Sequence, residues 1–220
     1  FKFPSRNALG VKEKKAINQV VEFYKKKKVD PGYQGHFEDK LCKKFSSMMG
    51  GGYADACSSG TAATFIAISA LNLKKGSEVL ISPVTDSGPL NALILLGLKP
   101  KLIDSSPNNY NVSAAQFLKR VSKKTKAAII MHIGGETSDI HKICIEAKKR
   151  NIKIIEDCSQ APFAKSIWLK KYFKKCNNKF VGGYGDISFF STMFSKTISS
   201  CGSAGLVFTK NKKLYHNVLA

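Results

Sequence analysis

The sequence predicts an α/β protein built on a mostly parallel, seven-stranded sheet with helices on both faces. Beyond the glycine run at residues 50–52, short apolar runs alternate with stretches of helical periodicity. Strands that alternate with helices in this way form parallel sheets that the helices cover. The apolar runs also have the length and composition of strands, and they occupy residues 54–58, 78–82, 101–104, 127–132, 152–156, 186–190 and 206–209.

Apolar residues that recur every three or four positions predict the helices. They indicate helices within residues 17–24 and 37–48, within 61–71, 114–121 and 140–147, and from 214 onward. We therefore divide the chain into an N-terminal helical segment (1–50), a large domain (51–209) and the start of a C-terminal region (210–220). Because the chain starts at Phe1 rather than a methionine, we expect its start to be trimmed. Because its last residues open a further helix, we expect the C-terminal region to be truncated.

Composition narrows the classes of partner. With 220 residues and 43% hydrophobic content the chain can bury one sizeable core. The net charge of +21 invites a nucleic-acid partner, but the lysines are scattered and no nucleic-acid-binding motif accompanies them. No apolar run is long enough to cross a bilayer. The six cysteines form no C-x-x-C pair and no zinc-like grouping. We expect no nucleic acid, no membrane and no metal as partners, and a reducing, cytoplasmic location.

Ligands of parallel α/β sheets bind beyond the carboxyl ends of the strands, so the residues after each strand are the site candidates. After residues 54–58, two hydroxyls and Gly60 precede an alanine-rich helix that begins near Thr61. The free N–H groups and dipole of a helix start attract anions, and Gly60 lets a phosphate approach the backbone. A plain Ser/Thr helix cap is the alternative.

A second strand, residues 152–156, ends in two acids. Side chains alternate along a strand, so Glu156 and Asp157 point to opposite faces. Asp157 reaches the ligand edge if Ile155 packs in the other layer, and Gln160 can reach the same space. The alternative is a solvated loop acid.

A third strand ends near Ser191, and Lys196 follows it among apolar and small residues. Poorly solvated surroundings favour the neutral, nucleophilic amine of a lysine. Together these features supply what pyridoxal phosphate requires. The helix start and Ser191 would hold the phosphate, Asp157 would pair with the pyridine nitrogen, and Lys196 would form the imine. The lysine-rich residues 170–179 form an insertion that would attract anionic substrates, unless they are a solvated loop without a role.

Three motifs in order carry a family resemblance. They are S-S-G-T-A-A at residues 58–63, E-D-x-x-Q-A at 156–161 and G-D-I-x-x-F-S-x-x-x-x-K at 185–196. In them the chain resembles the DegT/DnrJ-type, StrS-like sugar aminotransferases, which are fold type I pyridoxal-phosphate enzymes. The resemblance implies the fold type I large domain with its small C-terminal domain missing, and a homodimer with sites at the interface.

The resemblance also implies residue roles. Lys196 matches the Schiff-base lysine that shuttles the proton, Asp157 the partner of the pyridine nitrogen, and Gln160 the residue near the ring hydroxyl. The phosphate cradle matches Gly60, Thr61 and Ser191. His132, at the end of a strand, matches a family histidine that we interpret as structural.

The chain departs from the family pattern in two turns. Where the family usually places an aromatic residue that stacks on the cofactor ring, this chain has Asp86. The turn before the last strand, residues 201–205, lacks the family's glutamate. The carboxylate of Asp86 in place of a stacking ring leaves the substrate and donor specificity open.

The expected reaction moves an amino group from an amino acid, with glutamate as the expected donor, to a keto sugar that can be nucleotide-linked. Such a reaction belongs to amino-sugar or surface-polysaccharide biosynthesis. A pyridoxal-phosphate sugar dehydratase of the same family is one alternative, but those enzymes typically replace the lysine with histidine. A truncated or degenerate relative with a binding or regulatory role is the other, which Asp86 and the missing domain keep open.

Overall fold

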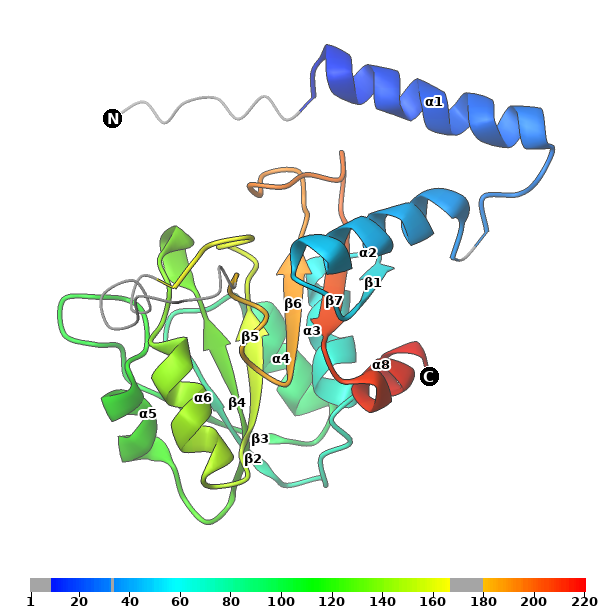
Figure 1. Ribbon diagram of the computed structural model, residues 1–220. Helices are drawn as coiled ribbons and strands as arrows, with labels where there is room; N and C mark the ends of the chain where they lie inside the picture. The colour runs from blue at the N-terminus through cyan, green and yellow to red at the C-terminus, as the bar shows by residue number, and fades with distance from the viewer. Residues whose placement is uncertain (1–8, 33, 167–179) are drawn as a thin grey trace.

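The computed structural model describes residues 9–32, 34–166 and 180–220. A seven-stranded sheet in the order β1-β7-β6-β5-β4-β2-β3 organises this part of the chain (Figure 1). Only β7 runs antiparallel to its neighbours, whereas the other pairs are parallel. The predicted mostly parallel sheet is confirmed, and the strands are β1 (Tyr53–Cys57), β2 (Glu78–Ile81), β3 (Lys99–Leu102), β4 (Thr125–Met131), β5 (Lys153–Asp157), β6 (Ile187–Ser191) and β7 (Gly205–Thr209).

Helices cover both faces of the sheet, as predicted. One face carries α3 (Gly60–Ser69), α4 (Ser87–Leu95) and α8 (Lys212–Leu219), whose apolar side chains pack on a shared core cluster. The other carries α2 (His36–Met48), α5 (Ala114–Arg120) and α6 (Ile140–Lys148), which pack on two further clusters. The first helix, α1 (Val11–Lys27), buries no residue and lies apart from the sheet (Figure 1). No helix in the described ranges has the length and apolarity of a membrane span.

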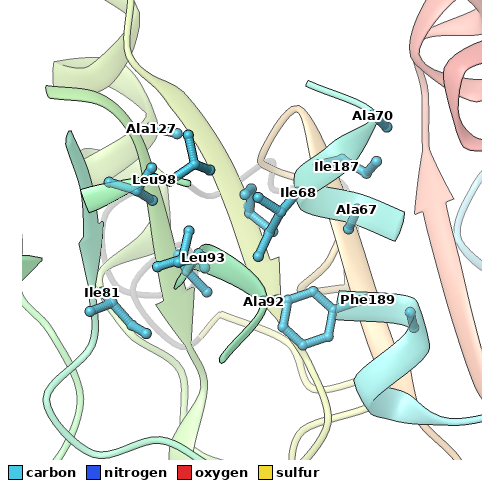
Figure 2. Close-up of a cluster of buried hydrophobic side chains, with 14 of the residues drawn as sticks. Ala67, Ile68, Ala70, Ile81, Ala92, Leu93, Leu98, Ala127, Ile187 and Phe189 are labelled. Carbon is cyan, nitrogen blue, oxygen red and sulfur yellow. The ribbon is translucent and has the colours of Figure 1, made fainter. Parts of the chain in front are cut away.

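The core cluster beneath α3 and α4 fixes how these two helices sit on the sheet. Figure 2 shows Ala67 and Ile68 of α3 beside Ile187 of β6, and Leu93 of α4 beside Ile81 of β2. Small residues on α3 let its backbone approach the strands closely, and burial of each large apolar side chain contributes about 1.5–3 kcal/mol. The close packing brings the N-terminal ends of both helices to the carboxyl edge of the sheet.

Helix α4 was not predicted, because Gly88 and Pro89 in its first turn are typical of turns. Pro89 lies in the first turn, where a backbone N–H has no acceptor within the helix, so the missing donor costs little. Asp86 caps the helix, since its Oδ1 accepts a hydrogen bond from Gly88 N at 3.0 Å. A local cap therefore starts a helix that periodicity alone did not reveal.

Asp157 reaches the ligand edge, although the condition set for it, that Ile155 packs in the other layer, is not met. Ile155 belongs to the cluster beneath α3, and Asp157 faces that same side, at the open edge next to α3. The reason is the two-residue period of a strand, which places positions i and i+2 on one face. Ile155 thus fills the core below the site, and Asp157 continues its face to the ligand edge. The lysine-rich insertion at residues 170–179 lies outside the described residues.

Candidate active site

A cavity of about 330 Å³ opens at the carboxyl edge of the sheet. Its walls come from the ends of β4, β5 and β6, from the segments that follow β1 and β2, and from the loop before β7. All of the cofactor and catalytic candidates line it, namely Gly60, Thr61, Asp86, Asp157, Gln160, Ser191 and Lys196. The topology therefore gathers in one space residues that are spread over most of the sequence.

The start of α3 forms one wall and presents unpaired backbone donors. Ser59 caps the helix, because its Oγ accepts a hydrogen bond from Ala62 N at 3.0 Å. Among the described residues nothing accepts from the N–H groups of Gly60 and Thr61. With the positive end of the helix dipole, two such donors make a site for an anion such as a phosphate.

Position 60 requires a glycine because a side chain would have no room there, and not because of its backbone conformation. A Cβ atom at position 60 would lie 2.6 Å from Ser191 Cβ and 2.8 Å from Ser191 Oγ. The hydroxyl of Ser191 thus stands directly against the first turn of α3. A donor side chain and free backbone donors converge there on the space that a phosphate would fill.

Thr85, which sequence reasoning missed, adds a further polar group. Its Oγ1 is buried and has no hydrogen-bond partner among the described residues, and the residue lines the cavity. A buried hydroxyl without a partner costs about 1–3 kcal/mol, which a ligand could relieve. Its position in the short segment between β2 and the cap Asp86 was the signal that could have found it.

Asp157 forms the floor of the cavity. Its side chain is buried at 2% relative exposure, and its Oδ1 accepts a hydrogen bond from Ser159 N at 3.0 Å. Burial raises the pKa of this carboxyl, against the hydrogen bonds of Ser159 and the positive charge of Lys196. A cationic group of a ligand beside Asp157 would stabilise its ionised form.

Lys196 lies in the loop between β6 and β7, is half-buried and lines the same cavity as Asp157. Backbone hydrogen bonds hold this loop as a compact turn: Thr192 N donates to Ala204 O, Phe194 N to Gly202 O, and Lys196 N to Met193 O. These hydrogen bonds fix the loop to the residues before β7, so Lys196 has a defined position at the cavity wall.

A buried network supports the floor from the opposite face of the sheet. Glu156 is fully buried and accepts hydrogen bonds from the backbone N–H groups of Gly182, Tyr184 and Gly185 at 2.6–2.7 Å. Its Oε2 also lies 3.2 Å from Nε2 of the buried His132. His132 Nδ1 accepts from Ser138 N, so the neutral ring carries its proton on Nε2 and donates it to Glu156.

This network favours the structural interpretation of His132, which does not line the cavity. Burial alone would raise the pKa of Glu156, but His132 and the backbone donors outweigh it and lower the pKa below the ordinary value. The network joins the ends of β4 and β5 to the segment before β6, and it thereby fixes the strands that carry Asp157 and Ser191.

The remaining candidates lie at the mouth of the cavity. Gln160 is exposed, and its Oε1 accepts from Gly134 N at 2.9 Å, which ties the end of β5 to η1 (Ile133–Gly135). Asp86 is also exposed and combines its cap of α4 with a place on the cavity wall. Met131 and Ser203 line the cavity as well, but no sequence motif distinguished them.

The geometry can be compared with known protein families. Residues 11–220 match the model of the DegT/DnrJ/EryC1/StrS aminotransferase family. The chain belongs to this family. The match covers almost all of the chain, including every candidate residue of the cavity.

Individual members of the family and solved structures are similar along most of the chain. GDP-perosamine synthase of Escherichia coli O157:H7 is 33% identical over 186 residues, which are 84% of this chain and 48% of that protein. The structure of NtdA from Bacillus subtilis with bound cofactor PMP has a TM-score of 0.81 at 25% identity, covering 96% of this chain and 45% of the other. GDP-4-keto-6-deoxy-D-mannose-3-dehydratase of E. coli with bound hydrated PLP has a TM-score of 0.81 at 25% identity, covering 98% and 52%. The chain thus spans about half the length of these relatives.

Proposed function

We propose that this chain is the cofactor-binding part of a pyridoxal-phosphate-dependent aminotransferase that acts on sugars. The observation that carries the proposal is the convergence of a buried carboxylate, Asp157, a half-buried amine, Lys196, and an open helix N-terminus in one cavity. Each of these groups matches one chemical part of pyridoxal phosphate: its ring nitrogen, its aldehyde and its phosphate. As part of this proposal, residues 51–209 form the cofactor-binding domain, between the N-terminal helical segment and the start of a C-terminal region.

The residues present fit this cofactor. The free N–H groups of Gly60 and Thr61 and the hydroxyl of Ser191 would hold the phosphate, because a Cβ at Gly60 would close the space between them. Asp157 would hold a proton on the pyridine nitrogen, since a carboxylate in low-dielectric surroundings pairs strongly with a cation. Gln160 would border the ring hydroxyl.

Catalysis would divide between the cofactor and this chain. When bound, the cofactor supplies an electron sink for the carbon that carries the transferred nitrogen. Lys196 Nζ would be the basic atom that takes up and returns the proton during amino transfer. Asp157 would keep the pyridine nitrogen protonated throughout, and its burial excludes water from that pair.

The substrate class of the proposal rests on relatives. Similar proteins are named for nucleotide-linked sugars, including GDP-perosamine synthase and dTDP-3-amino-3,6-dideoxy-alpha-D-galactopyranose transaminase. We propose a keto sugar, in nucleotide-linked form, as acceptor and an amino acid, with glutamate expected, as donor. We also propose a homodimer and a role in amino-sugar or surface-polysaccharide biosynthesis.

The proposal is tested by locating the cofactor bond. Borohydride reduction of the chain loaded with pyridoxal phosphate should attach the cofactor to the peptide with residues 194–197. Lys196→Ala should abolish this labelling yet still bind the cofactor non-covalently, because the phosphate cradle is separate from the amine. Lys126→Ala, at an exposed position of β4, is the matched control and should label like the parent. Labelling of another lysine would sink the assignment.

Dehydration is a second candidate function, because a sugar dehydratase is among the similar structures. Lys196 favours amino transfer, since dehydratases of this family typically carry histidine instead. With glutamate and a keto nucleotide sugar supplied, mass spectrometry of the sugar distinguishes the two reactions. A product that has gained nitrogen supports amino transfer, and one that has lost oxygen without gaining nitrogen supports dehydration.

A further inference from the structure

One of the two carboxylate oxygens of Asp86 has no hydrogen-bond partner among the described residues. Its Oδ1 caps α4 by accepting from Gly88 N at 3.0 Å, and no described residue donates a hydrogen bond to Oδ2. The side chain is exposed and stands on the wall of the cavity. Helix capping needs only an acceptor oxygen, which Asn or Ser provides about equally well. The negative charge at this position is therefore not explained by the cap.

The carboxylate of Asp86 is one of few charged groups that line the cavity. The ionisable residues that line the cavity are Asp86, Asp157 and Lys196. Asp157 is buried on the floor, whereas Asp86 lies near the start of α3: a Cβ at Gly88 would lie 3.4 Å from Thr61 Oγ1 and 3.5 Å from Asp86 Oδ1. In a cavity of about 330 Å³, any ligand held at the α3 wall experiences the field of this carboxylate.

We infer that Asp86 is a specificity-determining residue that selects the ligand state carrying a protonated amine over its uncharged counterpart. The inference rests on the proposed function, in which the cofactor alternates between an aldehyde and an amine. A carboxylate attracts the ammonium group and has no such attraction for a neutral group of the same size. It repels the phosphate equally in both ligand states, so that repulsion cancels when the two are compared.

The test uses two ligands that differ by a single ammonium group. Pyridoxamine phosphate carries the amine, and 4′-deoxypyridoxine phosphate has hydrogen in its place and cannot bond to a lysine. Dissociation constants of both are measured by fluorescence titration for the parent chain and for Asp86→Asn. Asparagine keeps the cap of α4 and removes only the charge. Asp86→Ser serves as a second neutral cap if the first variant folds poorly.

We expect Asp86→Asn to weaken pyridoxamine phosphate binding about fivefold and deoxypyridoxine phosphate binding less than about twofold. An exposed ion pair contributes up to about 1 kcal/mol. Because a tenfold change in affinity corresponds to about 1.4 kcal/mol, loss of the pair weakens binding about fivefold. The selectivity of the parent should also fall with added salt, because the pair is screened. Asp104→Asn, an exposed acid outside the cavity, should change neither constant.

Two results would overturn the inference, and they separate it from the proposed function. If the parent binds both ligands and Asp86→Asn leaves their affinity ratio unchanged, Asp86 is a helix cap only and the proposed function stands. If the parent binds neither ligand, the proposed function fails and the inference falls with it.

Discussion

The Glu156→Gln substitution replaces one oxygen of a buried carboxylate with an amide nitrogen and leaves the shape of the side chain almost unchanged. In the parent, Oε1 accepts from Tyr184 N at 2.7 Å and from Gly185 N at 2.6 Å. Oε2 accepts from Gly182 N at 2.7 Å and lies 3.2 Å from His132 Nε2. Every contact of this carboxylate is thus with a hydrogen-bond donor.

A glutamine can satisfy only one of these two pairs. Whichever way its amide is turned, the NH₂ group faces two donors and leaves them unpaired. A tautomer change at His132 would not help, because Nδ1 would then carry a proton against Ser138 N, from which it now accepts. A buried donor without a partner costs about 1–3 kcal/mol. We therefore expect the free energy of unfolding to fall by about 2–5 kcal/mol.

The assay is thermal and urea unfolding of the cofactor-free chain, followed by circular dichroism. For a chain of this size about 1 kcal/mol corresponds to roughly 2–4 °C, so the melting temperature should fall by roughly 5–20 °C. Glu136→Gln is an exposed substitution of the same chemistry, and among the described residues its carboxylate accepts a hydrogen bond from Asn109 alone. This control should stay within about 0.5 kcal/mol of the parent. A loss below about 1 kcal/mol for Glu156→Gln would refute the network argument.

The same variant should change the response to acid. The hydrogen bonds of Glu156 hold its pKa below the ordinary carboxyl value, even though burial opposes them. Its contribution to stability is therefore complete above the unfolded-chain pKa of 4.5 and is lost as the pH falls through the lower folded pKa. Because glutamine does not titrate, the stability of Glu156→Gln should fall less steeply with acidification than that of the parent.

Two further predictions concern the cavity itself. Gly60→Ala should push Ser191 out of place and weaken pyridoxal phosphate binding at least tenfold by absorbance titration, because the added Cβ would meet Ser191 Cβ at 2.6 Å. Gly202→Ala, where nothing lies within 4 Å of the added atom, should bind like the parent, and equal affinities for both variants would remove the steric argument. Asp157→Asn should raise the melting temperature of the cofactor-free chain by a few degrees, about 1 kcal/mol, because burial raises the pKa of Asp157 and makes its charge costly at neutral pH. It should also slow amino transfer by orders of magnitude in an active enzyme; a variant that is less stable, or transfers as fast as its parent, would contradict the assigned role.

Local patterns were sufficient for most of the fold. The apolar runs predicted the seven strands of the sheet to within two residues at each end. The clearest runs belong to β4 and β5, because a buried parallel strand must be apolar on both faces. The exception among the helices is α4, whose start depends on the Asp86 cap rather than on periodicity. The motifs around Gly60, Asp157 and Lys196 could also be read from the sequence, since each lies at the end of a strand or a few residues beyond it.

The sequence by itself thus determined the α/β class, the order of the strands along the chain and the family of the protein, because all three depend on residues that are neighbours in sequence. Only the tertiary structure decided which strand ends meet. It placed Thr85 and Met131 beside Asp157, and it put Ile155 on the same face as that carboxylate. It also closed the network of Glu156 with His132 and the segment before β6. These contacts join residues from separate strands and loops, and their geometry depends on strand register and crossover direction, which no local pattern specifies.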